Sequence, residues 1–145
     1  MTALLDVNVL VALMWEAHEQ HELVQRWFTR HARNGWATCP FTQAGFVRIL
    51  SSAAFSRDAV APLHALAVLT ATLENRFHRF WPDDIGFAEA VGPFRGKLHG
   101  HRQVTDAYLL GLAIRKRGRI ATLDQGLAAL LPDGAERGRI ELIAA

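Results

Sequence analysis

Three aspartates stand beside apolar segments, where a carboxylate is costly to bury. Asp6 closes the run ALLD and Asp124 closes RIATLD, and both runs are typical of short buried strands. Asp106 lies near the start of QVTDAYLLGLA, a segment with helical periodicity. Taken singly, each has a structural alternative, because aspartate caps helices, favours their first turns and forms local turns. Taken together, they predict one site that gathers carboxylates from distant parts of the chain.

Gathered carboxylates repel one another unless a cation neutralises them. Two unit charges about 4 Å apart repel by about 4 kcal/mol at an effective dielectric near 20. An all-oxygen set of carboxylates and waters suits Mg²⁺ or Mn²⁺. Such an ion polarises a phosphoryl oxygen and lowers the pKa of a bound water so that the water attacks. The three aspartates therefore predict metal-assisted hydrolysis of a phosphodiester.

Alternating strands and helices explain how distant aspartates would meet. Strands are expected near 3–6, 36–39, 79–81, 119–124 and 140–144, and helices near 8–15, 18–33, 43–54, 58–74, 104–117 and 126–131. Thr42 and Asp58 are the predicted N-caps of the third and fourth of these helices. The alternation indicates an α/β fold with a mostly parallel sheet covered on both faces. Ligands bind beyond the carboxyl ends of such strands, at the edge where Asp6 and Asp124 are expected.

The length and composition of the chain limit the classes of protein it can be. Its 145 residues suit one domain spanning 1–145, and no repeat or linker suggests a second. A formal net charge of +2 permits an anionic partner such as nucleic acid without requiring one. The single cysteine, Cys39, cannot form an internal disulfide, and no apolar run is long enough to span a membrane. We therefore expect a cytoplasmic protein without a signal peptide or a membrane partner.

Four segments resemble, in order and spacing, the motifs of PIN-domain ribonucleases, above all the VapC toxins of VapBC toxin–antitoxin pairs. They are LLDVNVLVAL, CPFTQAGFVRILS, GHRQVTDAYLLGLA and ATLDQGLAAL, and they run from about residue 3 to residue 131. The resemblance implies a PIN-like three-layer sandwich whose mostly parallel central sheet has four or five strands. It also implies a homodimeric endoribonuclease that depends on Mg²⁺ or Mn²⁺, cuts RNA with a metal-activated water and pairs with a cognate VapB-type antitoxin.

The resemblance also assigns roles to individual residues. Asp6 and Asp106 fall on the positions that bind the metal directly. Asp124 falls on the position that holds a second ion or orients a metal-bound water. Asn8 and Thr105 would support the acidic residues with hydrogen bonds.

Gln43 departs from the family pattern. Many relatives carry glutamate after the threonine of this helix, whereas TQAGF places an amide there. An amide carbonyl accepts a hydrogen bond from a metal-bound water but brings no charge. Three carboxylates in place of four leave the number of metal ions, one or two, open. The alternative is a catalytically weakened PIN domain that acts as an RNA- or protein-binding module.

Several basic residues are candidates for contacts with RNA phosphates. Arg48 is one, and Arg95, Lys97 and Arg102 lie in the glycine-broken segment RGKLHGHR. Neutralising the backbone supplies most of the non-specific affinity of a protein for nucleic acid. The alternative for this segment is a solvated loop, which is also what we expect for the cationic helix end at 115–117.

Two other chemistries have weaker support in the sequence. Phosphoryl transfer through an aspartyl nucleophile needs a lysine beside it, and the only lysines are Lys97 and Lys116, in a basic loop and a helix end. The histidine pairs in HEQH and HGH suggest zinc, but no further Cys or His completes four ligands at zinc spacing. Cys39 is expected to be a small buried hydrophobic residue and not a nucleophile.

Overall fold

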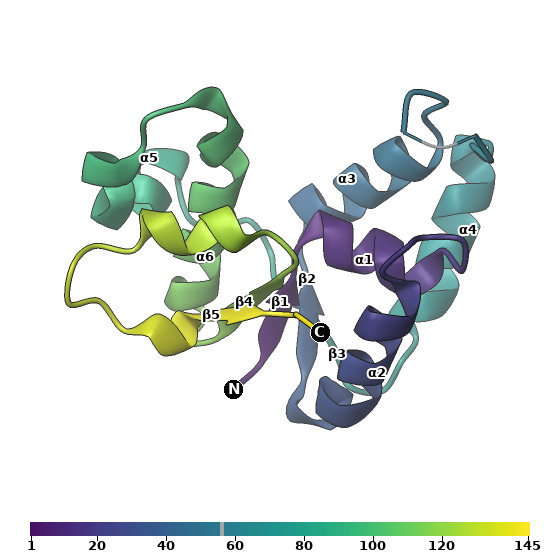
Figure 1. The fold of residues 1–145 in the computed structure, drawn as a ribbon, viewed down its shortest axis with the longest axis horizontal. Helices are drawn as coiled ribbons and strands as arrows, with labels where there is room; N and C mark the ends of the chain where they lie inside the picture. Colours follow the sequence, from purple (N-terminus) through teal and green to yellow (C-terminus); the bar gives the residue numbers. More distant parts are fainter. Residues whose placement is uncertain (56) are drawn as a thin grey trace.

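A five-stranded sheet runs through the centre of the computed structural model, which describes residues 1–55 and 57–145 (Figure 1). The strands are β1 (Ala3–Leu5), β2 (Trp36–Thr38), β3 (His78–Phe80), β4 (Arg119–Thr122) and β5 (Ile140–Leu142). Their order is β3-β2-β1-β4-β5, and each neighbouring pair is parallel. The predicted α/β class and parallel sheet are confirmed, and the sheet has five strands.

Helices connect the strands and cover both faces of the sheet (Figure 1). The α-helices are α1 (Val7–Met14), α2 (His21–His31), α3 (Pro40–Leu50), α4 (Pro62–Leu73), α5 (Phe87–Val91) and α6 (Val104–Arg115). The 3₁₀ helices are η1 (Ala32–Asn34), η2 (Gly92–Lys97), η3 (His101–Gln103), η4 (Gln125–Leu130) and η5 (Arg137–Arg139). In the part of the chain that the structure describes, no helix has the length and apolar character needed to cross a membrane.

Successive residues of the central strands point into two separate cores. Leu4 and Ile120 belong to a buried cluster that they share with Leu109 and other residues of α5 and α6. Their neighbours Leu5 and Ala121 belong to a second cluster, built with α1, α2, α3 and α4. This alternation follows from the two-residue repeat of a β-strand. The result is the predicted three-layer sandwich, with α5 and α6 on one side and α1 to α4 on the other (Figure 1).

Two glycines let helices approach each other closely. A Cβ atom at Gly111 of α6 would overlap the carbonyl oxygen of Ala90 in α5. One at Gly45 of α3 would lie 2.8 Å from Cγ2 of Val7, the first residue of α1. Glycine at position 45 therefore sets how closely α3 packs against the helix that begins directly after Asp6.

Two helices begin at prolines and not at the predicted caps. α3 starts at Pro40, with Cys39 as its N-cap, and α4 starts at Pro62. The predicted N-caps Thr42 and Asp58 were wrong, because the fixed φ of proline favours the first position of a helix and so determines where each one starts. Thr42 lies inside the first turn of α3, where its Oγ1 accepts a hydrogen bond from the Cys39 amide at 3.0 Å.

Candidate metal centre at the carboxyl edge of the sheet

Asp6 directly follows β1, and its carboxylate is held on both sides. The Val7 amide donates to Oδ1 at 2.7 Å, which makes Asp6 the N-cap of α1. The Thr122 hydroxyl, at the end of β4, donates to Oδ2 at 2.8 Å. Asp6 is only 7% exposed, and this burial raises its pKa, although both hydrogen bonds lower it. Asp6 is thus a fixed, buried acid that forms no ion pair with any described residue.

Asp124 lies two residues after β4 and is exposed. Its amide donates to Oγ1 of Thr122 at 3.0 Å, and its Oδ1 accepts from the Gly126 amide at 2.8 Å. The second bond caps η4, which is the structural role that aspartate at a strand end suggested. One hydroxyl, that of Thr122, therefore connects Asp6 and Asp124, since it donates to the first and accepts from the backbone of the second.

Asp106 lies in the first turn of α6 and is half-buried. Its carboxylate accepts no hydrogen bond from any other described residue and forms no ion pair with one. Burial, and then the negative charges of Asp6 and Asp124, raise the pKa of Asp106 to about 6. A helix N-terminus favours a negative charge, but it does not offset these effects. The shift places the three predicted acids within electrostatic reach of one another at one edge of the sheet.

The chemistry of this donor set fits Mg²⁺ or Mn²⁺. It is anionic and contains only oxygen ligands, and a carboxylate oxygen that accepts one hydrogen bond keeps a second lone pair. Asp106, with both oxygens unbonded to the described residues, is the member that most lacks a partner. Within residues 1–55 and 57–145, however, no three His, Cys, Asp or Glu side chains are gathered tightly enough to enclose a metal ion as they stand.

Gln43 is anchored one strand away from Asp6. Its Nε2 donates to Oγ1 of Thr38, the last residue of β2, at 2.9 Å. The Thr38 hydroxyl is buried and also lies 2.8 Å from Nε2 of His78 on β3. β2 is the neighbour of β1, so Gln43 is fixed at the same edge of the sheet as the acids. Its amide nitrogen is used by Thr38, which leaves its carbonyl oxygen as the group that can accept.

Asn8 and Thr105, the predicted supporting residues, are close to the acids in the chain but are not held. Asn8 is exposed in the first turn of α1, and Thr105 is the second residue of α6. Neither side chain forms a hydrogen bond with another described residue. Their predicted role as hydrogen-bond partners of the acidic residues stays a prediction.

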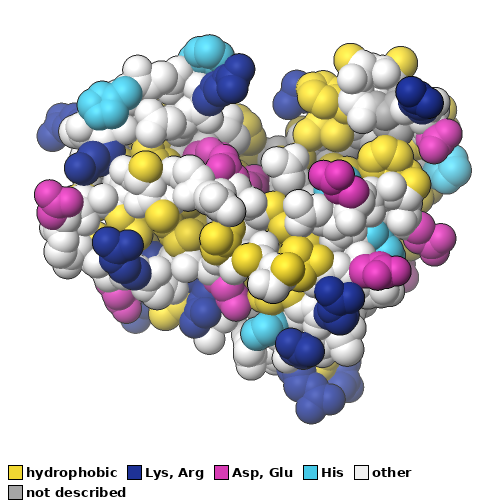
Figure 2. Space-filling view, viewed as in Figure 1, with side chains coloured by type: hydrophobic (Ala, Val, Ile, Leu, Met, Phe, Trp, Pro, Cys, Tyr) yellow, Lys and Arg dark blue, Asp and Glu magenta, His cyan; other side chains and the backbone are white. Residues whose placement is uncertain are grey.

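The predicted RNA-binding residues lie on α3, η2 and η3, close to a notch in the surface. Figure 2 shows this notch between the lobe of α5 and α6 and the lobe of α3 and α4, with acidic side chains near its floor and basic ones on both rims. Arg48 is exposed on α3, Arg95 and Lys97 lie on η2, and Arg102 is exposed on η3. Lys97 lies 4.0 Å from the carboxylate of Asp133. The three arginines form no ion pair with any described residue.

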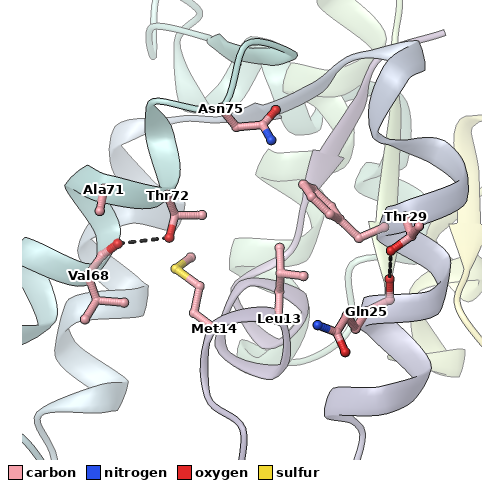
Figure 3. Close-up of a pocket in the computed structure, with 9 residues that line it drawn as sticks. Leu13, Met14, Gln25, Thr29, Val68, Ala71, Thr72 and Asn75 are labelled. Atoms are coloured by element: carbon pink, nitrogen blue, oxygen red, sulfur yellow. Dashed lines mark hydrogen bonds between the residues drawn. The ribbon is translucent and has the colours of Figure 1, made fainter.

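A groove of about 520 Å³ lies between α2 and α4, and none of the three acids lines it (Figure 3). Its walls carry Leu13, Met14, Gln25, Phe28, Thr29, Val68, Ala71, Thr72 and Asn75. None of these side chains is charged. The Thr29 and Thr72 hydroxyls bond at 2.9 Å to the carbonyls of Gln25 and Val68 in their own helices. The groove therefore offers no charged group for a metal ion or a phosphate, and its size does not mark the reactive site.

Thr122 and Thr38 are site residues that the sequence reasoning missed. Each is a fully buried polar residue at the last position of a strand, and each bonds to a predicted site residue. The available signal was a hydroxyl inside an apolar strand next to the polar edge, as in RIATLD. Cys39, by contrast, is buried as predicted, and burial raises the pKa of its thiol, which disfavours a nucleophilic thiolate.

Comparisons with known proteins agree with this arrangement. Residues 3–130 match the PIN domain family. Ribonuclease VapC39 of Mycobacterium tuberculosis is 45% identical over 99% of this chain and 100% of its own length. Ribonuclease VapC44 of the same organism is 40% identical over 94% of this chain and 96% of its own length.

A solved structure shares the fold at much lower identity. It is the crystal structure of VapBC2 from Rickettsia felis bound to a DNA fragment from their promoter, with a TM-score of 0.64 and 14% identity over 98% of this chain and 97% of that one. At this identity the likeness concerns the fold alone. Together with the family match and the full-length relatives, it shows that the chain belongs to the PIN-domain family, in the group of the VapC ribonucleases.

Proposed function

We propose that this chain is a metal-dependent endoribonuclease and the toxic member of a type II toxin–antitoxin pair. The observation that carries the proposal is the convergence of Asp6, Asp106 and Asp124 at one edge of the sheet, where burial and then the charges of the other two acids raise the pKa of Asp106 to about 6. Three neighbouring acids, one of them without a partner among the described residues, make a site that a cation would stabilise. The full-length similarity to proteins named ribonucleases supports RNA as the substrate.

Asp6 and Asp106 would hold Mg²⁺ or Mn²⁺, with Asp124 beside them for a second ion or an attacking water. When bound, such an ion supplies a polarised phosphoryl oxygen and a water of lowered pKa. Asp6 brings a fixed geometry, because Val7 and Thr122 hold its two oxygens. Thr122 is a positioning residue in this account. Asn8, Thr105 and the carbonyl of Gln43 would accept or donate hydrogen bonds around the reacting phosphate.

Basic residues of α3, η2 and η3 would hold the RNA backbone. Arg48 on α3, and Arg95, Lys97 and Arg102 on η2 and η3, would neutralise phosphates on either side of the scissile bond. This role predicts that cleavage weakens as salt rises, since counterion release drives such contacts. One PIN domain over residues 1–145 would carry the whole activity.

The assembly proposed for the chain follows its relatives. The fold neighbour is a VapBC complex, and the sequence relatives are VapC proteins. A VapB-type antitoxin is therefore the proposed protein partner. We also propose that two copies of the chain pair as a homodimer and that the protein acts in the cytoplasm.

Cleavage of RNA by the purified protein tests the proposal. Cellular RNA is incubated with Mg²⁺ or Mn²⁺, and the ends of the products are mapped by sequencing. Wild type should cut, Asp6→Ala should not, and Glu74→Ala, which changes an exposed acid at the end of α4, should cut like wild type. Equal rates for wild type and Asp6→Ala would exclude the proposed site.

A substrate with a 2′-deoxy nucleotide at the scissile position tests which nucleophile attacks. If water attacks, this substrate is still cut, and the matching all-ribose substrate gives products without a 2′,3′-cyclic phosphate. If the neighbouring 2′-hydroxyl attacks, the substitution stops cleavage. The second result would contradict hydrolysis by an activated water.

The second candidate function is a catalytically weakened PIN domain that binds RNA or protein. The observation in its favour is Gln43, which brings no charge and whose amide nitrogen is used by Thr38. This alternative predicts RNA binding without cleavage under all metal conditions. The Gln43→Glu variant distinguishes the two, because it should create activity in a weakened domain and should only strengthen Mn²⁺ binding in an active one.

A further inference from the structure

A second, smaller groove adjoins the acids. It has a volume of about 250 Å³ and is lined by Val7, Phe41, Ala44, Gly45, Arg48 and Thr105. Val7 follows Asp6 in the chain, and Thr105 precedes Asp106. Two of the lining residues are therefore chain neighbours of the two proposed metal ligands, so a nucleotide whose phosphate lies at the acids is within reach of the groove.

The groove presents one face of α3 with an aromatic ring at one end. Phe41, Ala44, Gly45 and Arg48 follow the spacing of residues on one side of a helix. The Phe41 ring is 48% exposed. Its centroid lies 5.9 Å from that of Tyr108, which packs against the ring at an angle of 33°. Phe41 is thus a supported ring with a free surface.

The middle and the far end of the groove suit a flat group that carries a phosphate. Ala44 and Gly45 leave room between Phe41 and Arg48, and Gly45 cannot be larger because Val7 is in contact there. Arg48 is exposed and forms no ion pair with any described residue. An aromatic platform, a floor of small residues and an unpaired guanidinium are the elements by which proteins hold a single-stranded nucleotide.

From this geometry we infer that the groove is a nucleobase subsite. The base next to the scissile phosphate stacks on Phe41, and Arg48 contacts the adjoining phosphate. The inference rests on the proposed function, since it names a subsite of the same ribonuclease. It makes Phe41 a substrate-binding residue that positions a base of any identity, and it requires RNA whose bases are unpaired at the cleavage position.

The chain contains a matched control for Phe41. Phe87 is also 48% exposed, and its ring packs against the same residue as Phe41, Tyr108. The centroids of the Phe87 and Tyr108 rings are 6.2 Å apart, with an angle of 9° between the ring planes. It does not line the groove. Phe41→Ala should lower kcat/KM for a mapped RNA oligonucleotide by roughly 5- to 150-fold, the range of a base–aromatic stack, and Phe87→Ala should not. Thermal unfolding of both variants verifies that they are folded.

Abasic nucleotides identify the base that occupies the groove. One abasic position is moved along the oligonucleotide, and kcat/KM is measured for wild type, Phe41→Ala and Phe87→Ala. In wild type and Phe87→Ala, one position beside the cut should be sensitive. In Phe41→Ala that sensitivity should disappear, because the stack is already lost. Equal sensitivity in all three proteins, or equal loss in Phe41→Ala and Phe87→Ala, would overturn the inference.

A binding readout separates failure of this inference from failure of the proposed function. An oligonucleotide with 2-aminopurine at the sensitive position, or at each position in turn if no RNA is cut, is titrated with protein in Mn²⁺. Stacking on Phe41 should quench its fluorescence in wild type and Phe87→Ala but not in Phe41→Ala. Phe41-dependent quenching without cleavage would support the subsite and contradict the ribonuclease activity. Cleavage without Phe41-dependent quenching would support the ribonuclease activity and contradict the subsite.

Discussion

The end of β1 and the first turn of α6 bring carboxylates to the same edge of the sheet but hold them differently. Asp6 is buried and accepts hydrogen bonds from Val7 and Thr122. Asp106 is half-buried, accepts none from the described residues, and has its pKa raised to about 6. Burial raises the pKa of both acids, so both charges oppose the fold, but Asp6 also forms hydrogen bonds that the fold uses. One edge of the sheet thus combines an acid that is hydrogen-bonded within the fold with an acid that has no partner among the described residues.

Asp106→Asn removes the charge of the acid that has no partner among the described residues, and it has the largest expected effect. RNA cleavage should fall by about 100-fold or more, because even indirect supports of metal ligands contribute roughly 10- to 100-fold. In metal-free buffer the variant should melt about 2–5 °C higher than wild type, since it removes an unpaired charge. Cleavage assays and thermal unfolding in EDTA measure the two effects. A lower melting temperature with full activity would contradict both parts.

Asp6→Ala removes the acid that is hydrogen-bonded to Val7 and Thr122. Cleavage should again be lost, but stability should fall by about 1–2 kcal/mol, because the N-cap of α1 is removed and the Thr122 hydroxyl loses its acceptor. Urea unfolding of Asp6→Ala and Asp106→Asn in the absence of metal compares them directly. Asp6→Ala should have the lower free energy of unfolding of the two variants, because only Asp6 forms hydrogen bonds, and the reverse order would contradict the different roles of the two acids.

Thr122→Val sharpens the comparison, because it leaves both acids in place and removes the hydroxyl that holds Asp6. Cleavage should fall by about tenfold, the lower range for a residue that orients a metal ligand. Thr72→Val is the control, since its hydroxyl bonds only to a carbonyl of its own helix. Equal rates for the two threonine variants would mean that the position of Asp6 does not depend on Thr122.

The smallest effect is a pH dependence of stability that belongs to Asp106. Its pKa rises from 3.8 to about 6 on folding, so between these values the folded state binds more protons than the unfolded state. This contribution therefore makes metal-free wild type less stable as pH rises through that window. The difference in melting temperature between Asp106→Asn and wild type should be small near pH 4 and full above about pH 7. A difference independent of pH would contradict the assignment.

The sequence was sufficient to predict the sheet and the acids but not how the acids are held. Alternating apolar strands and helices placed Asp6 and Asp124 at one edge, because parallel strands end together. Whether a carboxylate has partners depends on side chains brought together by the fold. Thr122 is more than one hundred residues from Asp6 along the chain, and its hydroxyl does not reveal its partner. The same holds for Gln43, whose amide is fixed by the buried hydroxyl of Thr38.

The helix starts show a local limit of the same kind. Thr42 and Asp58 are good capping residues, but the prolines at 40 and 62 determine where α3 and α4 begin. The segment after Asp124 was predicted as a short helix and is the 3₁₀ helix η4, which Asp124 caps. Where two residues could each start a helix, the backbone geometry of proline decides between them. Asp124, which caps η4, has a structural role as well as a proposed chemical one.

Titration of the metal-free protein with Mn²⁺, followed by calorimetry, tests the claim that the partnerless acid exists for a cation. Wild type should bind Mn²⁺ at neutral pH and melt at a higher temperature when it is saturated. Asp106→Asn should show neither binding nor stabilisation, although it is the more stable protein without metal. Binding of equal strength by the two proteins would show that the carboxylate on α6 is not a ligand and would end the account.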